Sequence, residues 1–320
     1  MPDRLTLIAL KGIPLVKPGD GLANLIGDAL EQSDERLADG DILVVAQKIV
    51  SKTENRLVDV TTIEPSDQAK DLAVEVDKDP RVVEIILRES RDVIRKKPGV
   101  LIVENNLGLI MANAGIDHSN VESEVPEQTL LLLPEDPDAS AERLQRAIRC
   151  KFGVDVGVII NDSVGRPWRI GTMGLAIGIS GLPAVTDLRG DKDLFGRELR
   201  VSEEAVGDEL AAAASLLQGQ GAEGKPVVLV RGFRSDAPSQ SATAALRAAA
   251  ALRCAARGGA PRPTARPWAA WRRVAAASHG SVLRWCANAA PWGRATGRRW
   301  ERSLGRAGAE GGRRRRSSRC

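Results

Sequence analysis

Residues 39–52 read DGDILVVAQKIVSK, and this stretch decides the class of fold. The Asp-Gly-Asp sequence at 39–41 predicts a turn. The continuous apolar run at 42–46 predicts a short strand that is buried on both faces, as in a sheet covered by helices. We therefore expect a sheet at the centre of the molecule with helices packed against it.

The rest of the first 236 residues alternates between similar strands and helices. Apolar runs predict further strands at 5–10, 100–103, 107–111, 130–133, 154–160 and 226–230. Helical spacing predicts helices at 20–36, 66–97, 140–151 and 202–217. Pro80 is expected to begin a second helix within the 66–97 segment, and Ser140 and Ser202 are the predicted N-caps of the last two helices. The alternation predicts an α/β or mixed α+β body over residues 1–236.

The overall composition excludes several classes of protein. Of the 320 residues, 43% are hydrophobic and 28% are charged, as in soluble globular proteins. The longest uncharged run, residues 170–186, is interrupted by glycines and a proline and is too short to span a bilayer. Four cysteines cannot staple a chain of this length, and the apolar run at 5–10 is too short for a signal peptide. We expect a cytoplasmic protein that does not enter a membrane.

The distribution of charge divides the chain into two parts. Residues 1–236 carry a net charge of −12, whereas residues 237–320 carry +16, with 18 arginines and no lysine. Beyond about Ala248 the sequence shows neither helical nor strand periodicity. Three interpretations of this tail stay open: a basic arm that binds nucleic acid non-specifically or an acidic partner, a disordered extension, and translation of GC-rich DNA in the wrong frame.

Two segments near the N-terminus place small or basic residues after predicted strands, where open α/β sheets bind their ligands. Residues 12–15, Gly-Ile-Pro-Leu, indicate on their own no more than a turn. Residues 47–52 carry Lys48 and Lys52, whose ammonium groups suit a polyphosphate. Ordinary surface lysines would give the same pattern, and the spacing of a P-loop is absent.

A third segment, residues 112–120, offers oxygen ligands for a metal ion. It reads Ala-Asn-Ala-Gly-Ile-Asp-His-Ser-Asn, and its small residues allow the backbone to approach a ligand closely. Asp117 and Asn120 are hard donors of the kind that Mg²⁺ or Mn²⁺ accepts. His118 has no second His or Cys nearby with which to make a zinc site.

A fourth segment, residues 159–169, adds a second carboxylate. An apolar strand is expected to end at Asp162 and Ser163, which could complete a metal site with Asp117. Arg166 and Arg169 follow, and their guanidinium groups can bind phosphate or carboxylate in bidentate fashion. A simple turn with a stacked tryptophan is the alternative. Acidic groups at two separate strand ends, with lysines and arginines nearby, favour a site for metal and phosphate.

These segments together resemble the coenzyme F-420:L-glutamate ligase family. The similarity runs in order, without a large gap, from about residue 5 to residue 232. It is carried by residues 12–15, 47–52, 112–120 and 159–169, with Leu-Pro-Glu-Asp-Pro-Asp-Ala-Ser-Ala at 133–141 and Asp-Glu-Leu-Ala at 208–211.

The resemblance implies a GTP-dependent amide ligase with an intertwined, two-lobed mixed-sheet body that forms a homodimer. In that family GTP phosphorylates the terminal carboxylate of the deazaflavin coenzyme F-420, and the amino group of L-glutamate then attacks the acyl phosphate. GDP and phosphate are released, and further rounds add γ-linked glutamates. The family uses two Mg²⁺ or Mn²⁺ ions, often with K⁺, which agrees with the need of phosphoryl transfer for charge neutralisation.

The resemblance also assigns roles to individual residues. Asp117 and Asp162 match ligands of one metal ion, and Ser163 stands where a ligand of the other is usual. With Arg166 and Arg169, the two aspartates are the expected catalytic groups. The positions that match nucleotide contacts are Gly12, Ile13, Pro14, Leu15, Gln47, Lys48, Lys52 and Asn120.

The sequence departs from the family pattern in four places. Residues 161–163 read Asn-Asp-Ser in place of the more usual Thr-Asp-Thr, although serine keeps the hydroxyl group. Residues 104–108 lack the basic and histidine residues often seen there, and Thr-Met-Gly at 172–174 replaces Gln-Thr-Asp. Beyond residue 247 the family's C-terminal ending is missing. Two alternatives stay open: a ligase for another carboxylate-ended cofactor, and a non-catalytic body with a tail that binds nucleic acid.

Overall fold

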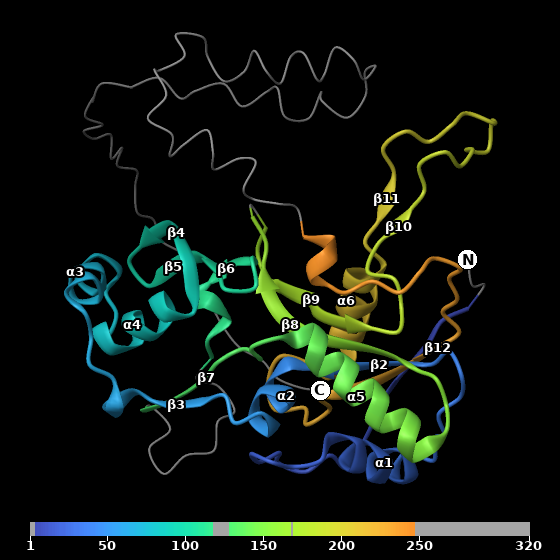
Figure 1. Cartoon of the computed structure of the whole chain (residues 1–320), viewed down its shortest axis with the longest axis horizontal. Helices are drawn as coiled ribbons and strands as arrows, with labels where there is room; N and C mark the ends of the chain where they lie inside the picture. The colour runs from blue at the N-terminus through green and yellow to red at the C-terminus, as the bar shows by residue number, and fades with distance from the viewer. Residues whose placement is uncertain (1–3, 118–127, 168, 247–320) are drawn as a thin grey trace, which may run out of the picture. The chain divides into compact units, whose positions relative to one another are not determined.

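Strand β2 (Ile42–Ala46) runs parallel to β8 (Gly157–Gly165) at the centre of a five-stranded sheet (Figure 1). The structure, a computed structural model, describes residues 4–117, 128–167 and 169–246. The strand order is β1-β12-β2-β8-β9, and the pairings other than that of β2 with β8 are antiparallel. The remaining strands of this sheet are β1 (Thr6–Ala9), β12 (Val227–Arg231) and β9 (Thr172–Ser180).

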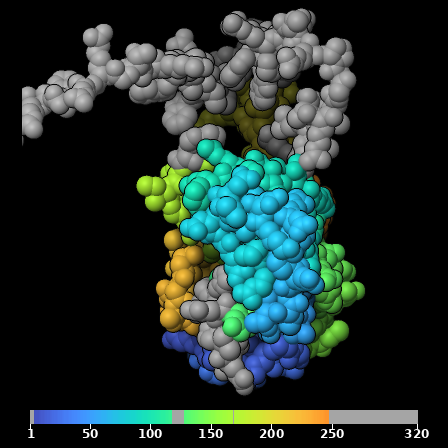
Figure 2. All heavy atoms as spheres, turned by 90° about the vertical axis from the view of Figure 1, so that its left-hand side faces the viewer, coloured from blue at the N-terminus to red at the C-terminus, as the bar shows by residue number. Residues whose placement is uncertain are grey.

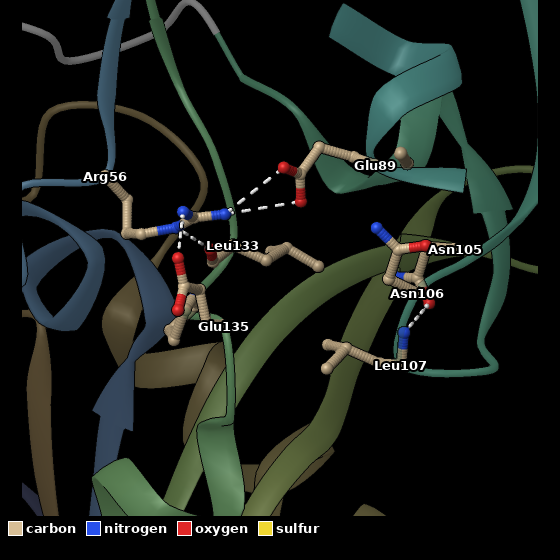
Figure 3. A pocket seen from close by; sticks show the side chains of 9 residues that line it. Arg56, Glu89, Asn105, Asn106, Leu107, Leu133 and Glu135 are labelled. Atoms are coloured by element: carbon tan, nitrogen blue, oxygen red, sulfur yellow. Dashed lines mark hydrogen bonds and ion pairs between the residues drawn. The ribbon is translucent and has the colours of Figure 1, made fainter. Parts of the chain in front are cut away.

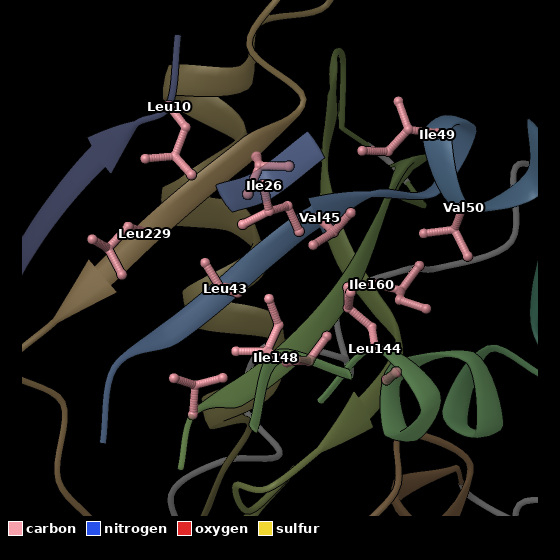
Figure 4. Close-up of a cluster of buried hydrophobic side chains, with 14 of the residues drawn as sticks. Leu10, Ile26, Leu43, Val45, Ile49, Val50, Leu144, Ile148, Ile160 and Leu229 are labelled. Carbon is pink, nitrogen blue, oxygen red and sulfur yellow. The ribbon is translucent and has the colours of Figure 1, made fainter. Parts of the chain in front are cut away.

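Helices cover both faces of this sheet, as the apolar run at 42–46 predicts. They are α1 (Leu22–Gln32), α5 (Pro137–Phe152) and α6 (Val206–Gln218). Leu43 and Val45 belong to a core that includes residues of α1 and α5, and Figure 4 shows this core. Ile42 and Val44 lie on the other face of the sheet, in a core with residues of α6. The strand thus buries apolar surface in both directions, which is a main source of stability at roughly 25 cal/mol per Å².

A second lobe has a hydrophobic core of its own. Its elements are the helices α3 (Asp67–Val76) and α4 (Pro80–Arg88) and the antiparallel strands β4 (Ser90–Lys97), β5 (Val100–Asn105) and β6 (Ile110–Ala112). Its core comprises Ala69, Leu72, Ala73, Val76, Val83, Ile86, Leu101, Val103 and Ala114. Figure 2 looks onto the surface of this lobe, drawn in light blue and cyan. The mixed α/β fold class is therefore confirmed.

Short elements connect and extend the two lobes. They are α2 (Gln47–Thr53), β3 (Leu57–Asp59), η1 (Val60–Thr62), η2 (Asn113–Gly115), β7 (Thr129–Leu131), β10 (Thr186–Asp187), β11 (Glu203–Glu204) and η4 (Thr243–Ala245). Strand β3 pairs with β7, and β10 pairs with β11 at the base of a projecting arm (Figure 1).

The expectation of helix throughout residues 66–97 is partly wrong. Two helices do form, and Pro80 begins the second one. Residues 90–97, however, are strand β4, which pairs with β5 through a turn at Gly99 with φ of 79°. Strand β4 is mostly exposed and charged, whereas Leu101 and Val103 of β5 are fully buried. The buried partner strand, and not the local pattern, decides the conformation of this segment.

Both predicted N-caps are wrong. Helix α5 begins at Pro137 and is capped by Asp136, whose Oδ1 accepts a hydrogen bond from the Ala139 N–H at 3.0 Å. Ser140 instead lies inside the helix and donates its hydroxyl to Glu54 at 2.6 Å. Helix α6 begins at Val206 without a side-chain cap, and Ser202 precedes strand β11.

The sequence patterns predict neither α2 nor β9. Strand β9 is rich in glycine, and its glycines are needed because helices approach it closely. A Cβ atom at Gly178 would lie 2.3 Å from the carbonyl oxygen of Pro137 in α5, and one at Gly174 would lie 2.5 Å from that of Ala211 in α6. The predicted strand at 107–111 is only partly correct, because β6 spans Ile110–Ala112.

Contacts divide the chain into one unit at Met1–Ala255 and a second at Ala256–Cys320. The tail from residue 247 lies outside the described residues, so its three interpretations and the boundary at residue 236 stay predictions. Within the described part, the end of the body is fixed on α5, because the N–H groups of Ala242 and Thr243 donate to the Asp138 carboxylate at 2.7 and 3.1 Å. None of the described helices is long and apolar enough to cross a membrane.

Candidate active site

A cavity of about 610 Å³ lies beyond the end of β2. Its wall is built from the loop after β1, the junction of β2 with α2, the middle of β8, Asp117 shortly after η2, and the loop between α6 and β12. A volume of this size falls in the range of small-molecule and cofactor sites.

The cavity wall brings together most of the residues that the sequence singled out. They are Ile13, Pro14, Leu15, Gln47, Lys48, Lys52, Asp117, Asp162 and Ser163. Gly12, Arg166 and Arg169 do not line the wall, and Asn120 and His118 lie outside the described residues. Residues more than 100 positions apart in the sequence thus meet at one edge of the sheet.

Asp117 is held at the cavity by its backbone and by a lysine. Its N–H and carbonyl groups pair with Leu131 at 3.1 and 2.9 Å, and its Oδ2 lies 2.7 Å from Nζ of Lys48. The preceding turn, η2, has positive φ at Asn113, Ala114 and Gly115. Glycine and asparagine adopt this backbone readily, which explains Asn113 and Gly115, whereas Ala114 adopts it at some cost.

Asp162 lies one residue beyond the end of β2, because Ala46 pairs with Asn161. Strand β8 itself continues to Gly165 in a hairpin with β9, so Asp162 and Ser163 lie within a strand and not at its end as predicted. Burial and, to a smaller extent, the negative charge of Asp117 raise the pKa of Asp162 to about 6. The Ser163 N–H and the charge of Lys48 act in the opposite direction.

Helix α2 supplies both lysines. Lys48 and Lys52 are four residues apart and therefore share one face of the helix, which is the cavity face. Gln47 is 2% exposed, and its Nε2 donates to Ser51 Oγ at 2.6 Å and to the Leu132 carbonyl at 3.3 Å. The side chain of Gln47 thus fixes the start of α2 against the segment that follows β7.

The loop at residues 219–225 lines the cavity and was not among the predicted site residues. Gly219 and Gly224 have φ of 74° and 65°, and the Gly221 N–H donates to the Glu223 carboxylate at 2.8 Å. The N–H groups of Glu223 itself and of Gly221, with that of Gln220, lower the pKa of the Glu223 carboxyl. Several N–H groups of this loop therefore already surround a negative charge.

A signal for this loop is present in the sequence. Residues 219–224 read Gly-Gln-Gly-Ala-Glu-Gly, which has the G-x-G-x-x-G spacing of phosphate-binding turns. In the dinucleotide-binding motif the glycines follow a strand and open a helix, whereas here they follow α6 and precede β12. The reversed context hides the motif from a search that requires strand before helix.

Arg166 and Arg169 lie beyond Gly165, in the connection from β8 to β9. Arg166 Nη2 donates to the Ile170 carbonyl at 3.4 Å, and its Nε is buried without a hydrogen-bond partner within the described residues. Neither guanidinium lines the cavity, so their catalytic role stays a prediction.

The donors at the cavity suit a divalent cation. No group of three or more His, Cys, Asp or Glu side chains with metal-binding geometry occurs among residues 4–117, 128–167 and 169–246. Two carboxylates and a hydroxyl nevertheless meet at the wall, and Asp117 is close enough to Asp162 to raise its pKa. The ammonium group of Lys48 lies 2.7 Å from Asp117 and lowers the pKa of Asp162, so the two carboxylates already attract a positive charge. Such hard oxygen donors are the ligands that Mg²⁺ and Mn²⁺ prefer.

A second, smaller pocket of about 230 Å³ surrounds Arg56 (Figure 3). The Arg56 guanidinium donates to the Leu133 carbonyl at 2.8 Å, to Glu135 at 2.9 Å and to Glu89 at 3.3 Å. The neighbouring Asn105 accepts N–H groups of its own turn. None of the predicted site residues lines this pocket.

Known proteins resemble the chain over the whole of the cavity-forming region. The model of a family described as F420-0:Gamma-glutamyl ligase matches residues 12–232. The coenzyme F420:L-glutamate ligase of Methanopyrus kandleri is 48% identical over 235 residues, which cover 72% of this chain and 90% of that protein. The proteins of the same name from Methanothermobacter thermautotrophicus and Archaeoglobus fulgidus are 45% and 46% identical over 229 and 230 residues, with 72% of this chain and 89% and 88% of theirs covered.

Proposed function

This chain belongs to the F420-0:gamma-glutamyl ligase family, and we propose that it joins L-glutamate to coenzyme F420 by an amide bond, driven by GTP. The observation that supports this most directly is the composition of the cavity wall. Two carboxylates, two lysines of one helix face and a glycine loop meet there, which is what a reaction between a nucleoside triphosphate and a carboxylate requires.

In the proposed reaction a carboxylate oxygen of the coenzyme attacks the γ-phosphorus of GTP. The bond to the bridging oxygen breaks, GDP leaves, and an acyl phosphate forms. The amino nitrogen of L-glutamate then attacks the acyl carbon, loses a proton and expels phosphate. The products are the amide, GDP and phosphate, so each amide bond consumes one GTP.

The glycine loop and the lysines are suited to bind the phosphates. The hydrogen bond from the Gly221 N–H to the Glu223 carboxylate supports an anion-binding role for this loop. Lys52 is only 9% exposed and Lys225 lies at the end of the loop, and both line the cavity. Their ammonium groups would neutralise the β- and γ-phosphates as point charges.

Asp117, Asp162 and Ser163 would hold the Mg²⁺ or Mn²⁺ ions. By the family resemblance, Asp117 and Asp162 would hold one ion and Ser163 the other. Bound metal would supply neutralisation of the phosphate charge. Lys48 lies 2.7 Å from Asp117 and lines the cavity, where its ammonium group would add to the neutralisation of the phosphates. A K⁺ ion stays part of the proposal on the strength of the family resemblance.

The projecting arm supports the proposed homodimer. Between β10 and β11 the chain forms a turn in which the Asp193 carboxylate accepts the N–H groups of Phe195 and Arg197 at 2.8 and 2.9 Å. This ordered turn leaves Leu194 and Phe195 100% and 84% exposed. Large apolar side chains displayed on a well-formed turn are typical of a contact surface. A Leu194→Asp, Phe195→Asp variant is expected to be monomeric in light-scattering measurements, and an unchanged mass would contradict this role of the arm.

A glutamate-transfer assay tests the proposed function. The full chain is incubated with GTP, Mn²⁺, L-glutamate and the coenzyme without its glutamate, and the coenzyme is analysed by mass spectrometry. We expect addition of glutamate with release of one GDP and one phosphate per amide bond, and no reaction when GTP is omitted. Addition without GTP would contradict the acyl phosphate route. If GTP is cleaved only in the presence of a different carboxylate compound, that compound and not the coenzyme is the acceptor.

A further inference from the structure

Gln218 is the last residue of α6 and immediately precedes the glycine loop at residues 219–225. Its Nε2 donates to two backbone carbonyls, those of Val44 and Pro226, each at 3.2 Å. Its Oε1 accepts a hydrogen bond from Nδ2 of Asn161 at 2.6 Å. One side-chain amide therefore contacts β2, β8 and the residue at which the loop enters β12.

Each of these partners lies in or next to a segment that lines the cavity. Val44 lies two residues before Ala46, after which α2 begins with its two lysines. Pro226 closes the glycine loop, and Asn161 is the neighbour of Asp162. The hydrogen bonds of Gln218 thus connect the lysine-bearing, phosphate-binding and carboxylate-bearing segments to one another.

The orientation of both amides follows from the carbonyl partners. Because Nε2 of Gln218 faces two carbonyl oxygens, Oε1 is the atom that faces Asn161, and Asn161 offers its Nδ2. Asn161 is 5% exposed, and its Oδ1 is left without a hydrogen-bond partner within the described residues. A buried acceptor of this kind lowers stability, so the arrangement is not explained by folding alone.

Asn161 also lies where the β8–β9 pairing changes register. Ile160 pairs with Gly178 but Asn161 pairs with Ala176, so β9 contains one extra residue. The Ala176 N–H donates to Asp208 of α6 at 3.1 Å. Bulges of this kind bend the strand that carries the extra residue, here β9, and interrupt its pairing with the opposite strand, here just before Asp162. At this interruption the Asn161–Gln218 hydrogen bond gives β8 an additional contact with the end of α6.

We propose that Gln218 is a positioning residue, which fixes the glycine loop relative to β2 and to the Asp162 segment of β8. The proposal rests on the proposed ligase function for its catalytic consequence, although the positioning itself does not depend on it. Gln218 acts through Asn161, Val44 and Pro226 and not by contact with the reacting atoms.

Gln218→Leu tests this role, because leucine approximates the size of glutamine and makes none of the three hydrogen bonds. We expect the backbone amides of residues 219–225 to exchange hydrogen at least about tenfold faster than in the wild type, without GTP or coenzyme present. GTP affinity and kcat should each fall about tenfold, while the KM for L-glutamate changes little. Gln218→Glu keeps the acceptor for Asn161 but turns a carboxylate toward two carbonyls, so it should resemble Gln218→Leu.

Gln145→Leu is the matched control. Gln145 makes the same kinds of contact at the opposite end of the β8–β9 pair, where Nε2 donates to the Val156 carbonyl at 2.8 Å and Oε1 accepts the Ser180 hydroxyl at 2.6 Å. This variant should lose thermal stability to a similar degree but keep wild-type exchange in residues 219–225 and wild-type GTP affinity.

The outcomes separate this inference from the proposed function. Unchanged exchange of the loop in Gln218→Leu, or equal effects of Gln218→Leu and Gln145→Leu on the loop, would overturn the positioning role. If the wild type fails to transfer glutamate but Gln218→Leu still loosens the loop, the proposed function is wrong and the positioning role stands.

Discussion

Two hollows in the described part of the body, the 610 Å³ cavity at the end of β2 and the 230 Å³ pocket around Arg56, differ in how their charges are paired. In the pocket the donors of Arg56 face a carbonyl and two carboxylates at distances of 2.8–3.3 Å. In the cavity, burial and the charge of Asp117 raise the pKa of Asp162 to about 6. In the pocket each charged group therefore has an ion-pair partner, whereas the cavity holds a carboxylate whose charged form its surroundings disfavour.

This difference helps to separate structure from function. A set of charges that satisfy one another stabilises the fold and has little need of a ligand. A buried carboxylate beside a second one lowers stability until a cation arrives, and such perturbed groups concentrate at functional sites. The predictions that follow test this contrast.

The largest expected effect is the loss of turnover in Asp162→Asn. The substitution removes a charge without changing shape, so glutamate transfer should fall on the order of 10³-fold while circular dichroism is unchanged. Asp117→Asn should behave alike. Asp208→Asn is the control, because burial also raises the pKa of Asp208 but this residue does not line the cavity. Activity of Asp162→Asn near the wild-type level under saturating Mn²⁺ would remove the metal assignment.

Arg56→Ala is expected to lower the stability of the fold and to leave turnover nearly unchanged. It removes three contacts of a side chain that is 17% exposed, and leaves Glu89 without its partner in the pocket. The free energy of unfolding should fall by about 2 kcal/mol in urea titrations. Turnover per folded molecule should stay within about twofold of the wild type. A large loss of turnover with normal stability would mean that the small pocket, too, takes part in the reaction.

Lys52→Ala should weaken GTP binding about tenfold or more, because a hydrogen bond between charged groups contributes roughly 1.5–3 kcal/mol. Isothermal titration calorimetry with GTP measures this directly. Lys70→Ala, which removes an exposed lysine of α3, should leave the affinity unchanged. Equal affinities for Lys52→Ala and the wild type would mean that Lys52 does not contact the phosphates of GTP.

The sequence predicts the elements that form the cavity better than the elements around them. Strand β2 was predicted with its observed bounds because its signal is local: five apolar residues in a row need cover on two faces. Asp117 and Asp162 could be singled out because each follows an apolar run. Strand β4 could not be predicted, since its residues are charged and its conformation depends on the partner β5.

The loop at residues 219–225 shows a different limit. Its glycines can be found in the sequence, but their role depends on the position of the loop beside Lys52 and Asp162. That position results from the parallel pairing of β2 with β8 and the antiparallel pairing of β12 with β2. The contacts of Gln218 depend on β2, on β8 and on the residue before β12, so they have no local signal in the sequence.

The smallest expected effect is a pH-dependent gain of stability in metal-free Asp162→Asn. The folded-state pKa of Asp162 is raised to about 6, against roughly 3.9 in an unfolded chain. Ionisation is therefore disfavoured in the folded protein: the penalty is absent below about pH 4, grows between pH 4 and 6 and is complete above pH 6. Asparagine carries no such penalty. In EDTA, the Tm of Asp162→Asn minus that of the wild type should thus rise by about 3 °C or more between pH 4 and 7.5. The response to metal gives a second measurement of the same residue. Mn²⁺ should raise the Tm of the wild type at pH 7.5 but not that of the variant, because only the folded wild type binds the ion more tightly than the unfolded chain does. Asp208→Asn should show a pH effect of the same sign but keep the full response to Mn²⁺. A Tm difference that is flat across this pH range would mean that the cavity accommodates the Asp162 carboxylate as well as the pocket accommodates those around Arg56.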